Sequence, residues 1–244
     1  MKPRFWSLPA LVALALLALA GTARAGSCEQ RTPTMFVLKG LIDADLAKCV
    51  ATRLAPTTTE LVVDSQGGQV GAALDIAERL STLNDLTIRV DGLCMSSCAD
   101  FFLPMARRLI AEPRAIIALH GGIDPALVSR SAPDKRFALT ALAQRQMDFA
   151  RRRHIPPGWL LYRTAEAPTR VDGLDGAYRW VTSSEPEVYL VEGPMLRTCL
   201  PWLDIGDYQA RLEAERFTPD AIARLKRNRV AATGTVVCNG ATWP

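Results

Sequence analysis

Three short polar loops in this chain each follow directly on an apolar run, and they constrain the fold more than any other feature. DSQGG (64–68) follows LVV, CMSSC (94–98) follows TIRVDGL, and HGG (120–122) follows AIIAL. If the three runs are parallel strands of one sheet, all three loops lie at its carboxyl edge, where open α/β folds bind ligands. That edge would hold a glycine pair, a hydroxyl and an imidazole, which are the parts of an acyl-transfer site.

The pattern along the rest of the chain predicts an α/β fold with a mostly parallel sheet. Short apolar runs alternate with stretches of helical periodicity, which is typical of βαβ units. The run at 61–63 is continuously apolar, as buried strands of parallel sheets are. The predicted strands are 35–38, 61–63, 86–90, 109–111 and 116–119, and the predicted helices are 43–54, 70–80, 97–106 and 138–152, the last beginning near Pro133.

Beyond residue 155 the periodic signal weakens. A Pro-Pro-Gly break at 156–158 ends the preceding helix, and residues 163–201 mix aromatic, proline and turn residues without a sustained period. A helix at 219–229 and a terminal strand at 235–238 are the elements that the pattern still predicts. We therefore expect a core at 26–155 and a less regular extension, 156–244, packed on it.

Residues 1–25 have the features of a cleaved secretory signal. Two basic residues precede an apolar stretch at 8–20, and ARA at 23–25 fits a small-x-small cleavage site. The stretch is too short to span a bilayer comfortably, and no later run is apolar and long enough to do so. A lipoprotein signal on Cys28 is a weaker alternative, because the residues before it match the usual lipid-attachment box poorly.

The charge balance after removal of that segment excludes two classes of partner. The segment holds three of the 29 basic residues and none of the 25 acidic ones, so its removal lowers the formal charge from +4 to +1. A nearly neutral chain argues for neither nucleic acid nor an anionic membrane as a partner. The remaining length is enough for one domain with a sizeable core.

The six cysteines are an even number, which in an exported chain predicts disulfides. We expect Cys28 to pair with Cys49, and Cys199 with Cys238, since each bridge would tie down a terminal region, although the sequence allows other pairings. A Cys/His metal site is disfavoured, because the chain has two histidines and its cysteine spacing matches no common zinc pattern. We therefore expect no metal.

Cys94 and Cys98 stand four residues apart around two serines. On a continuous helix, residues at this spacing have Cβ atoms about 5–6 Å apart, whereas a disulfide needs about 3.5–4.5 Å. A bridge between them therefore requires a bend. A strand-to-helix elbow would supply that bend, and the bridge would hold Ser96 in place.

Residues 61–122 resemble the Clp protease proteolytic-subunit family, within the ClpP/crotonase superfamily, and more closely its exported relatives with a Cys-x-Ser-x-Cys motif. DSQGG is similar to the family's strand-turn glycine pair, Met95-Ser96-Ser97 to its nucleophile elbow, and ALHGG to its strand-borne histidine. The spacing between Ser96 and His120 is also similar.

The resemblance implies a ClpP/crotonase-like spiral of ββα units over 35–154, and an exported, periplasmic protein that acts on peptides or proteins. Clp-like proteins often assemble into rings, so a homo-oligomer is an expectation. The helix at 138–152 is then a candidate assembly element. The alternative is an amphipathic helix that only covers the sheet.

The chemistry assigns a role to each motif. A serine hydroxyl needs a base within hydrogen-bond reach to become a nucleophile, and His120 is the candidate base for Ser96. The N–H of Ser97, together with that of Gly67 or Gly68, would bind the oxyanion beside the start of a helix. The motif register favours Ser96 over Ser97 as the nucleophile.

Each motif also has a plainer structural explanation. A serine before a helix usually serves as its N-cap, DSQGG can be an ordinary strand-to-helix turn, and a histidine that ends a strand is often structural. The three motifs in order favour a site over these separate explanations.

Two aspartates are candidates for the third member of a triad. Asp172 and Asp175 lie at a suitable distance along the chain, but both can be turn residues beside glycine. A serine/lysine dyad is less favoured, because none of the four lysines beyond residue 25 lies in a recognisable dyad motif.

Two functions of different classes follow from these residues. The first is an exported serine hydrolase, a peptidase that needs no cofactor. The second is a catalytically silent scaffold that binds a peptide or a partner protein in the periplasm. A crotonase-type thioester enzyme is a disfavoured third, because exported compartments offer little coenzyme A and a Ser/His pair is not what that chemistry needs.

Overall fold

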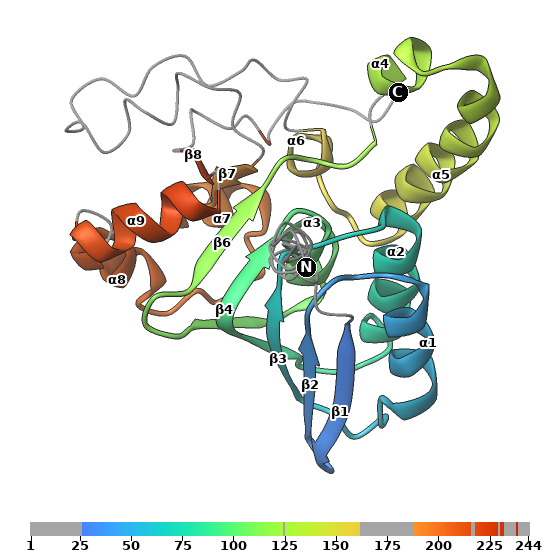
Figure 1. Ribbon diagram of the computed structural model, residues 1–244. Coiled ribbons are helices and arrows are strands. Elements are labelled where there is room, and N and C mark those ends of the chain that lie inside the picture. Colours follow the sequence, from blue (N-terminus) through green and yellow to red (C-terminus); the bar gives the residue numbers. More distant parts are fainter. Residues whose placement is uncertain are drawn as a thin grey trace, which may run out of the picture.

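The computed structural model describes residues 26–123, 125–161, 188–215, 218–228, 230–231 and 238. Within these residues, eight strands form one sheet in the order β1-β2-β3-β4-β6-β7-β8, with β5 also paired to β4 (Figure 1). The strands are β1 (Ser27–Thr32), β2 (Met35–Lys39), β3 (Glu60–Ser65), β4 (Thr87–Met95), β5 (Arg108–Ala111), β6 (Ile116–Leu119), β7 (Val188–Leu190) and β8 (Val230–Ala231).

The strand pairing is mostly parallel. Strands β2, β3 and β4 run parallel to one another, β4 runs parallel to both β5 and β6, and β7 runs parallel to β8. The antiparallel pairs are β1 with β2 and β6 with β7. The prediction of an α/β fold with a mostly parallel sheet is confirmed.

Strand β4 is longer than the sequence pattern predicted because it continues past Gly92. Its first half pairs with β5, and Leu93–Met95 pair with β6. At the junction, Gly92 has φ +134°, and a Cβ there would lie 2.5 Å from Asp64 Oδ1, which accepts the Leu93 N–H at 3.0 Å. Glycine at this position therefore leaves room for Asp64, and beyond it β4 runs on beside β6 to the carboxyl edge of the sheet.

One face of the sheet is covered by helices (Figure 1). Phe36, Leu61 and Ile88 of β2, β3 and β4 are fully buried in this main core, while their strand neighbours point to the other face. The helices in the described residues are α1 (Ala44–Arg53), α2 (Val70–Leu80), α3 (Ser97–Phe102), a 3₁₀ turn (Leu103–Met105), α4 (Pro125–Arg130), α5 (Pro133–Arg152), α6 (Pro157–Leu160), α7 (Gly193–Cys199), α8 (Tyr208–Glu215) and α9 (Pro219–Arg227).

Residues on both sides of position 155 share this core. Trp159 and Leu196 are fully buried in it, and β7 joins the edge of β6. The segment from β7 to β8 also makes a second, smaller core against β6. That core consists of Met95, Ile116, Ala118, Val188, Leu190, Leu225 and Val230. The terminal strand predicted at 235–238 lies, except for Cys238, outside the described residues.

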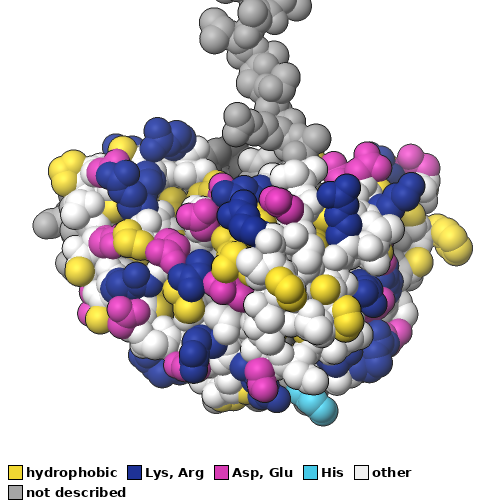
Figure 2. Space-filling view, turned by 90° about the horizontal axis from the view of Figure 1, so that it is seen from below, with side chains coloured by type: hydrophobic (Ala, Val, Ile, Leu, Met, Phe, Trp, Pro, Cys, Tyr) yellow, Lys and Arg dark blue, Asp and Glu magenta, His cyan; other side chains and the backbone are white. Residues whose placement is uncertain are grey.

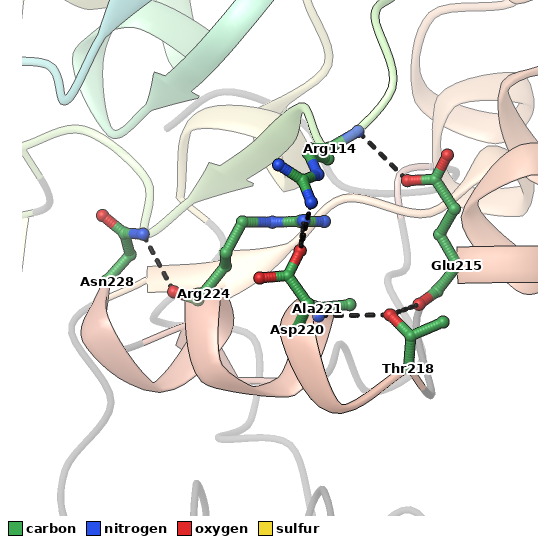
Figure 3. A network of polar contacts seen from close by, with 7 residues as sticks. All are labelled: Arg114, Glu215, Thr218, Asp220, Ala221, Arg224 and Asn228. Atoms are coloured by element: carbon green, nitrogen blue, oxygen red, sulfur yellow. Dashed lines mark hydrogen bonds and ion pairs between the residues drawn. The ribbon is translucent and has the colours of Figure 1, made fainter.

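A polar network holds α8 and α9 against the turn before β6 (Figure 3). The Arg114 N–H donates to Glu215 at 3.1 Å, and the Arg114 guanidinium lies 3.1 Å from Asp220. Asp220 also accepts from Arg224 at 2.6 Å, one turn later in α9. Thr218 caps the same helix by accepting the Ala221 N–H. These contacts anchor the C-terminal elements to the sheet.

All six cysteines are paired in disulfides: Cys28–Cys49, Cys94–Cys98 and Cys199–Cys238. The predicted bridges are therefore present in the structure. Disulfides persist in oxidising environments, so the bridges indicate a location outside the reducing cytoplasm.

Basic and acidic side chains are interspersed over the face of the molecule seen in Figure 2. In the sheet itself, Arg89 lies between Glu60 and Glu112 and donates to both at 2.5 Å. This face therefore carries no large patch of side chains with the same charge. No helix in the described part of the chain is long and apolar enough to cross a membrane.

Replacing the N-cap residue of α1 tests how local structure supports this core. Asp43 accepts the Leu46 N–H at 2.8 Å, so Asp43→Ala should lower the free energy of unfolding by about 1 kcal/mol. Asp43→Ser should keep most of the stability because a hydroxyl also caps. Urea denaturation of the oxidised protein measures the change, and Asp45→Ala, an exposed acid in the same turn, is the control. Equal losses for Asp43→Ala and Asp45→Ala would contradict the capping role.

Candidate active site

The three loops singled out in the sequence meet at the carboxyl edge of the sheet. The strands that precede them, β3, β4 and β6, are parallel neighbours in that order. Met95 is paired with Ala118, so the first residues beyond β4 and β6 leave the sheet side by side. The Ser96 N–H donates to the Ala118 carbonyl at 2.8 Å and extends this pairing into the loop.

Ser96 occupies a strained turn between β4 and α3. Its φ of 54° and ψ of −130° are conformations that residues with a side chain rarely adopt. The Ser96 carbonyl accepts the Asp100 N–H at 2.9 Å and so begins the helix. A strained serine at a sharp strand-to-helix turn presents its hydroxyl outward, which is the geometry of a nucleophile elbow.

The Ser96 hydroxyl is hydrogen-bonded to the imidazole of His120. The distance from Ser96 Oγ to His120 Nε2 is 2.6 Å. This distance lies within the range over which a base removes a proton from a nucleophile. The pairing of β4 with β6 thus brings together two side chains that are 24 residues apart in the chain.

The Cys94–Cys98 disulfide joins the strand and the helix on the two sides of the Ser96 turn. Both cysteines are fully buried, and their Cα atoms lie 5.2 Å apart. Cys94 is still in β4, whereas Cys98 is in α3, so the bridge spans the turn that carries Ser96. The bend that this spacing requires is present.

The glycine pair lets the loop after β3 come close to the elbow. Gly67 has φ +93°, and a Cβ on it would lie 2.7 Å from the Ser96 Cβ. Gly68 has φ +155°, and a Cβ there would collide with the Ile42 carbonyl. Both positions therefore require glycine for space as well as for conformation.

Both glycine N–H groups donate to serine hydroxyls in this structure. The Gly67 N–H donates to Ser65 Oγ at 3.1 Å, and the Gly68 N–H donates to Ser97 Oγ at 2.8 Å. Ser97 Oγ in turn donates to the Gly68 carbonyl at 3.2 Å. Ser97 is the first residue of α3, so its own N–H has no acceptor within the helix. A ligand oxygen that uses the Gly68 N–H must displace the Ser97 hydroxyl.

The helix that begins after Ser96 carries a buried carboxyl group. Asp100, on α3, is 1% exposed, and within the described residues its Oδ1 has no hydrogen-bond partner. Burial raises its pKa well above the ordinary value of 3.8, although a hydrogen bond from the Gly121 N–H lowers that pKa in part. Loss of hydration disfavours the charged form, so the carboxyl stays protonated over a wider range than an exposed one.

The sequence interpretation missed Asp100. It also missed Gln146, a fully buried side chain of α5 that binds the loop after His120. Gln146 accepts the Ile123 N–H at 2.9 Å and donates to the Ile123 carbonyl at 3.0 Å. For Asp100 a signal was present, since it is the one charged residue in the otherwise apolar run after Ser97. For Gln146 there was none, because a glutamine on an amphipathic helix is normally exposed.

Asp172 and Asp175, the candidates for the third member of a triad, lie outside the described residues. They therefore remain predictions. Within the described residues, no group of three His, Cys, Asp or Glu side chains could hold a metal ion.

Comparisons with known proteins add little detail. No protein-family model matches the chain, and no curated protein matches it. Among solved structures, the chain is similar to a mutant ClpP1 from Listeria monocytogenes, with 12% sequence identity and a TM-score of 0.43. The likeness covers 74% of this chain and 95% of that chain. The fold class rests on the strand pairing described above, and that pairing with the Ser96–His120 contact defines an α/β protein with a serine–histidine pair at its sheet edge.

The buried Asp100 predicts a pH dependence of stability. Its folded pKa is raised, so between 3.8 and that higher value the unfolded chain releases a proton that the folded chain keeps. The free energy of unfolding of the wild type, relative to Asp100→Asn, should fall by about 1.4 kcal/mol per pH unit across this window and then level off. Urea titrations at several pH values measure the difference. A difference that stays flat or rises with pH would contradict the raised pKa.

Removing the Cys94–Cys98 disulfide should increase the local motion of the backbone around Ser96 more than it lowers the stability of the whole protein. The Cys94→Ser/Cys98→Ser variant loses the bridge across the turn, so we expect the strained Ser96 backbone to relax. Amide hydrogen exchange at residues 94–100 measures the effect. The Cys28→Ser/Cys49→Ser variant is the matched control, because its bridge lies at the other end of the sheet order, on β1 and α1. Equal exchange at the elbow in both variants would show that the bridge has no local role.

Proposed function

We propose that the protein is an exported, Clp-protease-like serine hydrolase that cleaves peptide bonds. The observation that carries the proposal is the hydrogen bond of 2.6 Å between Ser96 Oγ and His120 Nε2 on a strained strand-to-helix elbow. The three disulfides support an oxidising compartment. Together with the secretory signal expected at 1–25, they favour the periplasm.

In the proposed reaction, Ser96 Oγ attacks the carbonyl carbon of a peptide bond while His120 Nε2 takes its proton. The carbonyl oxygen then carries negative charge, which the N–H of Ser97 and that of Gly67 or Gly68 would stabilise. His120 gives the proton to the departing amine, and an acyl-serine remains. Water activated by His120 releases the acyl group and restores the hydroxyl. None of these steps requires a cofactor.

Asp172 or Asp175 would orient the imidazole in this scheme. A carboxylate on the second ring nitrogen holds the tautomer in which Nε2 can accept the serine proton. A homo-oligomer formed through α5 is compatible with this function, and the substrate would be a peptide or a protein.

One observation favours the alternative of a silent scaffold that binds a peptide or a partner protein. The Gly68 N–H already has the Ser97 hydroxyl as its acceptor, at 2.8 Å. A site that never binds an oxyanion would keep that contact permanently. The hydrolase requires that the hydroxyl yields to the substrate, which is possible because Ser97 Oγ also has the Gly68 carbonyl as a partner.

A fluorophosphonate probe distinguishes the two functions. The probe should label the oxidised protein at Ser96, found by mass spectrometry of the digested adduct. Labelling should disappear in Ser96→Ala, and it should fall by a factor of 100 or more in His120→Ala, roughly the contribution expected of a general base.

Ser97→Ala is the matched control, because alanine keeps the backbone N–H and lies beside the nucleophile. Labelling should persist in it. If the wild type is not labelled at any pH while its fold and disulfides are intact, the scaffold is the better account. Labelling of Ser97 in place of Ser96 would overturn the assignment of the nucleophile.

A further inference from the structure

The loop that follows His120 is held by one side chain of α5. The last paired residue of β6 is Leu119, directly before the histidine. Three residues beyond the histidine, Gln146 Oε1 accepts the Ile123 N–H at 2.9 Å, and Gln146 Nε2 donates to the Ile123 carbonyl at 3.0 Å. A single amide thus binds both backbone polar groups of Ile123. Two such bonds fix the direction of the chain as well as its position.

Gln146 stands where α5 would be expected to carry an apolar residue. The buried residues of this helix are Ala143, Gln146, Phe149 and Ala150, and the glutamine is the polar one among them. Its exposed fraction is 0%. Burial of an amide is unfavourable unless hydrogen bonds replace those to water. An apolar residue would fill the same space but would leave the N–H and the carbonyl of Ile123 without these partners.

The same amide packs directly against Gly122, two residues after the histidine. A Cβ on Gly122 would collide with Gln146 Oε1 and would lie 2.6 Å from Gln146 Cδ. The Gly122 N–H donates to the Leu160 carbonyl of α6 at 2.5 Å. The loop therefore cannot move toward α5 without displacing the amide, and it cannot move away without breaking the bonds to Ile123.

The helix that presents the amide is itself fixed. Phe149, one turn after Gln146, is fully buried in the main core. Arg145 donates to Asp75 of α2 at 2.7 Å and lies 3.3 Å from Glu78 of the same helix. A group that positions another part of a site has to be held by its own surroundings, and α5 meets this requirement.

We propose that Gln146 is a positioning residue of the serine–histidine pair, because its amide holds the loop after His120 in the place that keeps the imidazole within reach of Ser96. This inference rests on the proposed hydrolase function. The bond between Ser96 Oγ and His120 Nε2 is 2.6 Å long, so a displacement of about 1 Å would take it beyond hydrogen-bond range. The amide acts through the backbone of Ile123 and the space beside Gly122, and no proton moves to or from it.

Two substitutions of the glutamine remove the amide. Gln146→Met keeps the length and most of the volume of the side chain, and Gln146→Ala also removes the volume. Each should lower the rate of fluorophosphonate labelling about 100-fold, as a displacement of about 1 Å does in well-ordered sites. Gln144→Ala is the matched control, because Gln144 is an exposed residue of the same helix and donates to Asp148 at 2.9 Å. Its labelling rate should equal that of the wild type.

Gly122→Ala tests the contact from the side of the loop. The added methyl group collides with the amide, so this variant should lose labelling although Gln146 is present. In Gln146→Ala the space is free, and Gly122→Ala should cause no further loss in that background. A double variant whose loss is the product of the two single losses would show that the residues act independently, which would overturn the proposal.

A second readout does not depend on activity. The chain has two histidines, His120 and His154, so nitrogen-15 spectra of labelled histidine show two imidazoles, and His154→Ala assigns them. The His120 resonances should move in Gln146→Met, Gln146→Ala and Gly122→Ala, and they should stay in place in Gln144→Ala. A glutamine that only stabilised the fold would leave these resonances unchanged in every folded variant. Far-UV circular dichroism checks that the variants are folded.

The outcomes separate this inference from the proposed function. If the folded wild type is not labelled, the hydrolase proposal fails, and the histidine spectra alone decide the role of Gln146. If folded Gln146→Met and Gln146→Ala keep the wild-type His120 resonances, the positioning role is wrong. If neither of them folds, Gly122→Ala decides by the same criterion. If none of the three folds, the amide serves folding, which also overturns the proposal.

Discussion

The candidate site depends on the parallel pairing of β4 with β6. Met95 opposite Ala118 sets the register, and the bond from the Ser96 N–H to the Ala118 carbonyl carries that register into the loops. A shift of one residue would turn the side chains of the last paired residues to the opposite face. The contact between the hydroxyl and the imidazole is therefore a property of the sheet, and neither loop could make it alone.

Around this pairing, the structure keeps the serine in a conformation that it would not adopt in a free chain. Three neighbouring features enforce the positive φ of Ser96: the disulfide that spans its turn, the glycine loop beside it and the helix that begins at its carbonyl. Strained backbone persists where several contacts enforce it, and such positions cluster at functional sites. The histidine side is built differently, since His120 has no positive φ and the loop after it is held by hydrogen bonds to α5 and α6.

The sequence pattern predicted much of the fold, for reasons that differ between elements. The ranges of β2, β6, α1 and α5 followed from apolar periodicity and from an N-cap or a proline at the start. Strand β1 was missed because its residues are mostly polar and partly exposed, and its place comes from pairing with β2. The predicted helix at 97–106 ends as an α-helix at Phe102, and a 3₁₀ turn with Pro104 completes it, since proline disfavours a continuing helix. Strand β7 has only three residues, too short for any period to be visible.

The sequence alone determined which groups could do chemistry: a serine between two cysteines, a histidine at a strand end and a glycine pair. It did so because strand ends, turns and cysteine spacing are local properties of the chain. Only the tertiary structure decided that β6 lies beside the end of β4, that the Ser97 hydroxyl accepts the Gly68 N–H, and that the side chain of Asp100 is buried. These features depend on which distant segments pack together, and that choice is made by the whole core and not by any stretch of sequence.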